Sequence, residues 1–362
     1  MAPLRVGFIG TGLKTDKPGP LSYGMANKHA VAYLDLPEGE VQLAACCDLY
    51  HDRAGQFAEL YGIPGEAVYT DYFEMLAKEE LDLVSVATWP DVHAQIVIDT
   101  ARAQPMGIFC EKPMAYTWAN CKRMVEACEQ SGVKLAFDHQ RRYGKPFRLA
   151  RQLIEDGAIG KLVRVEFGAG DLYEYGSHNF NLSGYLAGCT RGKWALGQVD
   201  YSKWKVVFGT HNENTALAYW EYENGVQGFA ATGRCAGFVG CHNRAVGTDG
   251  IIEMGPRAPE AEGYHLRYRI FGKGDWENVD TDGEHCHGPG YIERAIADFV
   301  ASTKAGTDSE LSAATALDGT EIIFAIWHSS RIHGLVELPL RVEDNALDAM
   351  VHSGALQPRP GS

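Results

Sequence analysis

The chain has 362 residues, of which 45% are hydrophobic and 22% charged, a composition typical of a globular protein with about two domains. Its 47 acidic residues outnumber its 33 basic residues, and the formal net charge is −14. This surplus argues against a nucleic-acid or anionic-membrane partner, because phosphate binding needs clustered lysine and arginine. No apolar run approaches the roughly 20 residues of a membrane span. With no signal-peptide pattern and no C-x-x-C pair among nine cysteines, we expect a cytoplasmic protein.

Residues 1–138 alternate short apolar runs with helical patterns. Strands are expected at 4–9, 41–47, 83–87, 107–110 and 134–137, with helices at about 22–36, 53–61, 92–103 and 117–131. Strands that alternate with helices in this way predict βαβ units. We therefore expect an α/β Rossmann domain with a doubly wound parallel sheet.

Residues 139–345 have the pattern of an α+β domain with a mostly antiparallel sheet. Strand-like runs occur at 163–167, 216–223, 226–232 and 264–271, and helical patterns at 147–156, 291–303 and 313–331. Asn224-Gly225, between two of these strands, is a strong hairpin signal. Residues 346–362 are expected to form a frayed tail.

A glycine turn, Gly10-Thr11-Gly12, directly follows the first strand and could let the backbone approach a pyrophosphate. The usual third glycine is missing, since residues 14–20 form an insertion, and Gly24 could take its packing role. Asp48 ends the second strand, where a carboxylate can accept both ribose hydroxyls and repel a 2′-phosphate. This favours NAD over NADP, although Asp48 could instead cap the next helix.

Further motifs follow in order: Thr88-Trp89-Pro90-Asp91-Val92-His93, Glu111-Lys112-Pro113, Asp156-Gly157-Ala158-Ile159-Gly160 and the run from Gly334 to Leu340. With the glycine turn and Asp48, this series resembles the Gfo/Idh/MocA oxidoreductase family over about residues 4–340. The resemblance implies a Rossmann domain, then an open-faced sheet domain, with substrate between that sheet and the nicotinamide. It implies cofactor contacts from Gly10, Thr11, Gly12, Leu13, Asp48, Thr88, Trp89, His93, Glu111 and Lys112.

The resemblance also implies catalytic residues. In the family a lysine contacts the reacting oxygen, here Lys112, and its bond to the following proline is often cis. An acidic residue and a histidine lie four residues apart on one helix, here Glu174 and His178, with glutamate where aspartate is usual. Because imidazole titrates near neutral pH, His178 is the expected base, and Lys112 would stabilise charge on the oxygen. Glu174 would orient the ring or relay the proton.

Candidate substrate contacts are Arg142, Tyr143, Tyr175 and Asn181, with a structural salt bridge as the alternative for the first two. His93 has the alternative of a helix N-terminal residue without a ligand. The clusters His285-Cys286-His287 and Cys235 with Cys241-His242 have poor spacing for metal ligands, so we expect no metal site. The aromatic-rich residues 194–208 suit a sheet face or an interface in a homodimer or homotetramer.

The leading hypothesis is an NAD-dependent dehydrogenase that oxidises a secondary hydroxyl of a sugar, a glycoside or an inositol. A redox-neutral glycoside hydrolase is the alternative, in which transient oxidation allows the glycosidic bond to cleave by elimination. Net accumulation of NADH separates the two. A non-enzymatic regulator of the same fold is expected to lose Lys112 or His178, and this chain has both.

Overall fold

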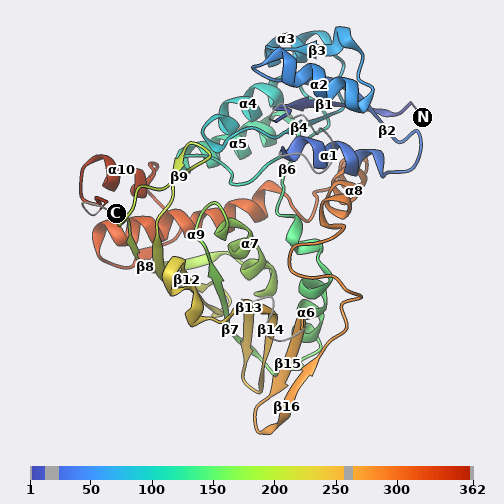
Figure 1. Ribbon diagram of the computed structural model, residues 1–362. Helices are drawn as coiled ribbons and strands as arrows, with labels where there is room; N and C mark the ends of the chain where they lie inside the picture. Colours follow the sequence, from blue (N-terminus) through green and yellow to red (C-terminus); the bar gives the residue numbers. More distant parts are fainter. Residues whose placement is uncertain (1, 13–23, 257–263, 359–362) are drawn as a thin grey trace. The chain divides into compact units, whose positions relative to one another are not determined.

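The computed structural model describes residues 2–12, 24–256 and 264–358 (Figure 1). The chain divides into two compact units, each discontinuous in sequence. Unit 1 comprises Met1–Gln140 with Ile292–Ala316, and unit 2 comprises Arg141–Tyr291 with Leu317–Ser362. The division differs from the expected domains 1–138 and 139–345 chiefly in that Ile292–Ala316 group with the first unit.

Unit 1 contains a six-stranded parallel sheet in the order β3-β2-β1-β4-β5-β6. The strands are β1 (Leu4–Ile9), β2 (Val41–Cys47), β3 (Val68–Tyr69), β4 (Leu83–Val86), β5 (Gly107–Cys110) and β6 (Lys134–Phe137). The helices between them are α1 (Met25–Leu34), α2 (His51–Tyr61), α3 (Tyr72–Lys78), α4 (Pro90–Arg102) and α5 (Trp118–Ser131). The prediction of a doubly wound parallel sheet is confirmed. The sequence pattern missed β3 and α3. A strand of 2 residues and a helix of 7 residues are too short to show a clear hydrophobic period.

Helix α8 (Tyr291–Lys304) supplies part of the core of unit 1. The rings of Phe299 on α8 and Phe109 on β5 lie 5.3 Å apart, centroid to centroid. A Cβ atom on Gly107 would lie only 2.8 Å from Phe299 Cζ, so glycine is required where the helix meets the strand. Phe137 N also donates to Leu311 O over 3.0 Å.

Unit 2 contains a nine-stranded sheet in the order β16-β15-β14-β13-β7-β12-β11-β8-β17. The strands are β7 (Leu162–Ala169), β8 (Gly192–Asp200), β11 (Thr215–Tyr222), β12 (Gln227–Thr232), β13 (Cys241–Gly247), β14 (Gly250–Pro256), β15 (Leu266–Ile270), β16 (Lys273–Asn278) and β17 (Val336–Glu337). Among these described strands only β12 and β7 pair in parallel, so the mostly antiparallel prediction is confirmed. The hairpin at Asn224-Gly225 is confirmed as well: Gly225 has a φ of 83° and Val226 N donates to Asn224 Oδ1.

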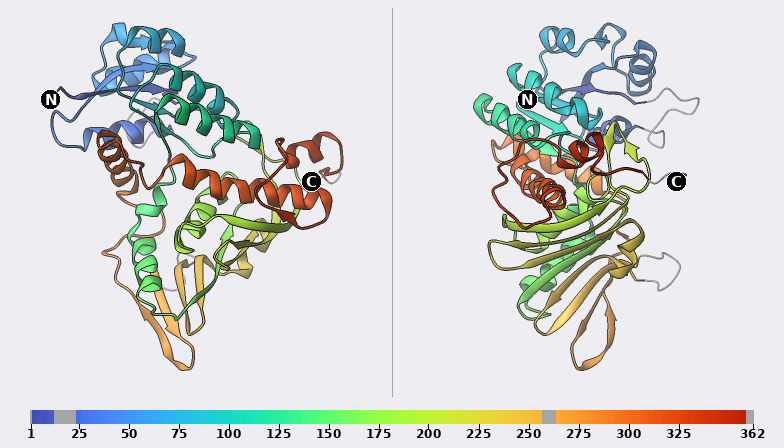
Figure 2. Two further views of the ribbon diagram at one scale, coloured as in Figure 1. Left: turned by 180° about the vertical axis from the view of Figure 1, so that it is seen from behind. Right: turned by 90° about the vertical axis from the view of Figure 1, so that its left-hand side faces the viewer.

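The two faces of this sheet differ. Helices α6 (Lys145–Glu155), α7 (Gly176–Leu186) and α9 (Ala313–Ile332) lie over one face (Figure 2). The opposite face leaves the apolar side chains of Leu196 and Leu217 each 42% exposed. Beside them a row of ion pairs crosses four strands, formed by Arg164, Glu166, Arg244, Glu253 and Arg267.

The expectation of a frayed tail from residue 346 is wrong, because α10 (Ala346–His352) forms there. Asn345 Oδ1 accepts a hydrogen bond from Asp348 N, which caps the helix, and Ala346, Leu347 and Met350 are buried.

Two further strands, β9 (Val206–Val207) and β10 (Thr210–His211), form a separate short hairpin. In the part of the chain that the structure describes, no helix is both long and apolar enough to cross a bilayer.

Candidate active site

The glycine turn after β1 requires its glycines. Gly10 has a φ of 85°, and a Cβ atom there would lie 2.7 Å from Ala87 O at the end of β4. Gly12 has a φ of 91°, and a Cβ atom on Gly24 would lie 3.3 Å from Gly12 Cα, so Gly24 packs against the turn. Gly24 is also the N-cap of α1 and makes no side-chain cap bond, which leaves amide donors of the first turn for an anion. Leu13 lies outside the described residues.

Asp48 joins the end of β2 to this turn. Its Oδ2 accepts hydrogen bonds from Thr11 N over 3.0 Å and from Thr11 Oγ1 over 3.2 Å. Its Oδ1 accepts from Tyr50 N, one residue before α2, so the carboxylate also supports the start of that helix. Both readings of Asp48, a ribose acceptor and a helix-capping residue, are compatible with this position.

The segment after β4 presents two further groups. Trp89 has 57% of its surface exposed. In the described part of the chain, Thr88 Oγ1 is buried without a hydrogen-bond partner. A buried hydroxyl without a hydrogen-bond partner is costly unless a ligand or a water molecule supplies the missing hydrogen bond. The glycine turn, the open start of α1 and this hydroxyl therefore fit a dinucleotide.

Glu111 points into unit 1 rather than out of it. Its side chain is buried, with Oε1 3.1 Å from His29 Nε2, and Oε2 accepts from Lys112 N over 3.1 Å. His29 Nδ1 lies 2.7 Å from Ser85 Oγ, and its Nε2 is 3.5 Å from Asp138 Oδ2. Burial opposes protonation of His29, but its bonds to Asp138 and Glu111 outweigh this and raise its pKa to about 9. The expected cofactor contact of Glu111 is thus replaced by a buried ionic cluster that anchors the loop of Lys112.

Lys112 itself is half-buried, and the Lys112–Pro113 peptide bond is cis, as the resemblance implied. His93, an expected cofactor contact, has its ring held inside unit 1. It is fully buried, with Nδ1 3.1 Å from Pro113 O and Nε2 3.1 Å from Thr88 O. Burial lowers the pKa of His93, against the effect of these carbonyl groups. The ring therefore ties the loop after β5 to the loop after β4.

In unit 2, Glu174 and His178 do not share a helix as expected. Helix α7 begins at Gly176, so His178 lies in its first turn and Glu174 in the preceding turn. Glu174 N donates to Asn212 Oδ1, and Tyr175 N donates to Asp171 Oδ1. A Cβ atom on Gly176 would lie 2.4 Å from Asp171 O. This close backbone contact therefore requires glycine at position 176.

Three of the four expected substrate contacts bond to or pack against neighbouring side chains of unit 2. Arg142 Nε donates to Asn181 Oδ1 over 3.2 Å, and both side chains are buried. The guanidinium of Arg142 also lies 5.0 Å from the ring centre of Tyr185. Tyr143 is buried under the guanidinium of Arg148, 4.9 Å from its ring centre. These residues thus make contacts within unit 2, and one partner of Arg142 is the amide of Asn181.

A cluster that sequence reasoning missed surrounds Tyr175. Arg141 Nη1 lies 3.0 Å from His242 Nε2, and its guanidinium lies 4.3 Å from the ring centre of Tyr175. Tyr175 Oη lies 3.4 Å from His287 Nε2, and the rings of His242 and His287 are 5.4 Å apart. Burial, together with Arg141, lowers the pKa of both histidines, that of His287 to about 4. The two imidazoles are thus neutral near pH 7 and suited to hydrogen bonds with hydroxyl groups.

A buried acid, Glu213, supports the turn that carries Glu174. Its carboxylate accepts from Leu172 N and from Trp327 Nε1 on α9, the latter over 3.2 Å. Burial and the nearby charge of Asp171 raise the pKa of Glu213 to about 7. Asp171 is itself paired with Lys205 over 2.9 Å. No local sequence motif marks Glu213, since its partners lie on distant segments.

Comparisons with known proteins agree with this fold. Residues 4–139 match a family model described as an oxidoreductase family with an NAD-binding Rossmann fold. An inositol 2-dehydrogenase of Salmonella typhimurium is 24% identical over 318 residues, which cover 83% of this chain and 92% of that protein. The aldose-aldose oxidoreductase from Caulobacter crescentus, crystallised with glycerol, superimposes with a TM-score of 0.75 at 21% identity over 93% of this chain and 100% of its own. A levoglucosan dehydrogenase in complex with NADH and L-sorbose gives a TM-score of 0.75 at 20% identity over 94% and 100%. At these identities the solved structures show a shared fold.

Proposed function

Because residues 4–139 match the model of an oxidoreductase family with an NAD-binding Rossmann fold, we propose that this chain belongs to the Gfo/Idh/MocA oxidoreductase family and is an NAD-dependent dehydrogenase acting on a secondary hydroxyl of a sugar, glycoside or inositol. One observation carries this proposal. The glycine turn, Thr88 and Lys112 follow β1, β4 and β5, which are neighbours in one parallel sheet. Their side chains therefore come from a single edge of that sheet, where open α/β folds bind ligands.

NAD, when bound, supplies the oxidising equivalent for the substrate carbon. Lys112 would donate to the reacting oxygen and stabilise the negative charge that develops there. His178 would take the hydroxyl proton, since a neutral imidazole is a suitable base near neutral pH. Glu174, in the turn before α7, would orient His178 or pass the proton to solvent.

Two finer proposals concern specificity. Asp48 favours NAD over NADP, because its carboxylate lies at the glycine turn and would repel a 2′-phosphate. The cluster of Arg141, Tyr175, His242 and His287 is the better candidate for contacting substrate hydroxyls, because Arg142 and Asn181 already bond to each other. The sugar and polyol names of the relatives support a polyhydroxylated substrate.

The test is NADH formation after the purified protein is mixed with NAD and a panel of inositols, free sugars and glycosides. The same samples are assayed for released aglycone. NADH that accumulates with one stereochemical set of polyols supports the dehydrogenase and names its substrate class. Glycoside cleavage without net NADH means a redox-neutral hydrolase and contradicts the proposal.

The roles of the two catalytic residues are tested by Lys112→Ala and His178→Ala. Each substitution should lower kcat/KM by about 10²-fold or more, the usual effect of losing an acid–base or charge-stabilising group. The matched controls are Lys78→Ala and His51→Ala, which remove exposed residues of the same types from unit 1. Wild-type turnover in either catalytic variant would remove that residue from the mechanism.

A further inference from the structure

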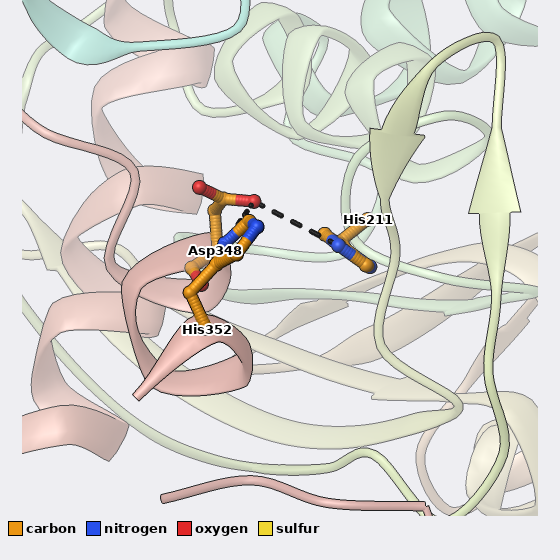
Figure 3. Close-up of side chains that lie close together, drawn as sticks. All are labelled: His211, Asp348 and His352. Atoms are coloured by element: carbon orange, nitrogen blue, oxygen red, sulfur yellow. Dashed lines mark hydrogen bonds and ion pairs between the residues drawn. The ribbon is translucent and has the colours of Figure 1, made fainter. Parts of the chain in front are cut away.

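Three residues with metal-binding side chains meet in unit 2, apart from every residue assigned above (Figure 3). His211 ends β10, and Asp348 and His352 lie one turn apart on α10. One potential ligand atom from each residue lies within 4.8 Å of the other two. Figure 3 shows both imidazoles linked to the carboxylate of Asp348.

Two of the three distances between these atoms suit a tetrahedral ion. Asp348 Oδ1 lies 3.2 Å from His352 Nδ1 and 3.8 Å from His211 Nε2. Ligand atoms about 2.0–2.1 Å from a tetrahedral zinc ion lie about 3.4 Å from one another, between these two distances. The longer distance exceeds a hydrogen bond, so His211 and Asp348 are aligned without bonding directly. His352 Nδ1 also lies 3.0 Å from the backbone oxygen of Asp348, and a bound ion would displace this hydrogen bond.

Asp348 Oδ1 gives further support for a cation. This oxygen is buried, and the imidazoles of His352 and His211 face it at 3.2 Å and 3.8 Å without a well-formed hydrogen bond. A carboxylate oxygen withdrawn from water is costly unless a positive charge compensates it. A cation between Oδ1 and the two imidazoles would supply that charge.

His211 is held in a fixed orientation for such a role. The ring is buried, and its Nδ1 lies 2.6 Å from the hydroxyl of Tyr201. The ring of Trp204 packs against the same ring in a T-shaped arrangement, with 4.8 Å between the ring centres. A metal-ligating histidine usually has its second nitrogen fixed by such a partner, which orients the first nitrogen toward the ion.

We propose that His211, Asp348 and His352 bind a zinc-type divalent transition-metal ion, with solvent as a further ligand. Two imidazoles and one carboxylate favour this class over Mg²⁺ or Ca²⁺, which prefer oxygen ligands. The ion can enter from solvent, because the side chain of His352 is 68% exposed. Helix α10 has 7 residues and is too short to be stable alone, so the ion would fasten it to the β9–β10 hairpin.

The experiment uses the full-length protein, free of any affinity tag, after chelation and dialysis. Zn²⁺ is titrated by calorimetry, and Co²⁺ is used as a spectroscopic probe of tetrahedral coordination. The wild-type protein should bind about one ion per chain, and Mg²⁺ should not compete. His352→Ala should weaken Zn²⁺ binding by about 10-fold or more, whereas the exposed His51→Ala should bind as the wild type does.

Two further measurements separate a built site from surface binding. Zn²⁺ at a hundredfold excess over its Kd should raise the wild-type Tm by about 5 °C and slow hydrogen exchange in residues 346–352. Asp348→Asn preserves the shape of the side chain, so a folded variant that loses both effects supports the assignment. Absence of Zn²⁺ binding to the wild type, or equal affinity in His352→Ala and His51→Ala, would overturn it. Neither readout depends on dehydrogenase activity.

Discussion

The two units assemble polar groups in different ways. In unit 1, Gly10, Asp48, Thr88 and Lys112 each follow the end of a parallel strand within two residues. In unit 2, Arg141, Tyr175, His242 and His287 come from segments spread over more than a third of the chain. A parallel sheet brings all its strand ends of one kind to one edge, so chain order predicts position there. In a mixed sheet, pairing between distant strands decides which side chains meet.

Each unit also contains a buried acid, and the two acids have different kinds of partner. Glu111 in unit 1 is neutralised by a charged histidine, while Glu213 in unit 2 is held by neutral donors. Glu111 therefore depends on its ion pair with His29, whereas Glu213 is accommodated because its raised pKa lets the carboxyl group keep its proton. The following predictions test this contrast, from the largest expected effect to the smallest.

Replacement of His29 should have the largest effect. His29→Ala leaves Glu111 and Asp138 buried without a countercharge, which typically costs about 3–5 kcal/mol of unfolding free energy. The raised pKa of His29, about 9 against 6.5 when unfolded, stabilises the fold fully below pH 6.5, and this stabilisation is lost as pH rises through 9. The cost of the substitution, measured by chemical denaturation, should therefore be greater below pH 6.5 than above pH 9.

His51→Ala is the control for His29→Ala, because this exposed residue should change stability by less than about 0.5 kcal/mol. A cost for His29→Ala that does not vary with pH would mean that only packing is lost. The ionic interpretation of unit 1 would then be wrong.

Glu213→Gln should cost about 1–3 kcal/mol, because the amide can no longer accept from both Leu172 N and Trp327 Nε1. The sign of the pH effect follows from a pKa raised from 4.5 to about 7. A group that binds its proton more tightly when folded adds stability below pH 4.5, and this contribution is lost as pH rises through 7. The cost should therefore be larger in acid than above pH 7, and a cost that grows with pH would contradict the protonated state.

Asp48→Ser should narrow the preference for NAD over NADP by about tenfold in kcat/KM, since one favourable contact and one repulsion are lost. Asp52→Ser removes an exposed carboxylate from α2 and makes the same change in net charge. If both variants shift the preference equally, long-range charge explains it and the position of Asp48 does not.

Glu174→Gln should have the smallest effect, a fall in kcat of about threefold to tenfold, because it acts through His178 and lies outside α7. The pH dependence of kcat distinguishes a relay from a packing role, since only a relay shifts the profile of the base. An unchanged rate and profile would remove Glu174 from the mechanism and leave His178 unaffected.

Sequence reasoning predicted what local patterns encode. The parallel strands, the hairpin at Asn224-Gly225 and the cis bond before Pro113 agree with expectation. The inward orientation of Glu111 was missed because its partner His29 lies inside a helix and belongs to no spacing rule. Helix α10 was missed although Asn345 is a good N-cap residue, because seven residues show little periodicity. The spacing of Asp348 and His352 was readable, but their neighbour His211 depends on tertiary structure.

The discontinuity of unit 1 has a consequence for synthesis of the chain. Phe109 and Gly107 are covered by Phe299, so the core of this unit needs residues beyond 291. While the ribosome is still making unit 2, the surface of β5 that receives α8 has no cover from its own chain. Residues 1–140 therefore emerge first but complete their fold after most of the second unit has been made. A fragment that ends near residue 140 should aggregate or bind chaperones, even though it contains the whole segment that matches the family.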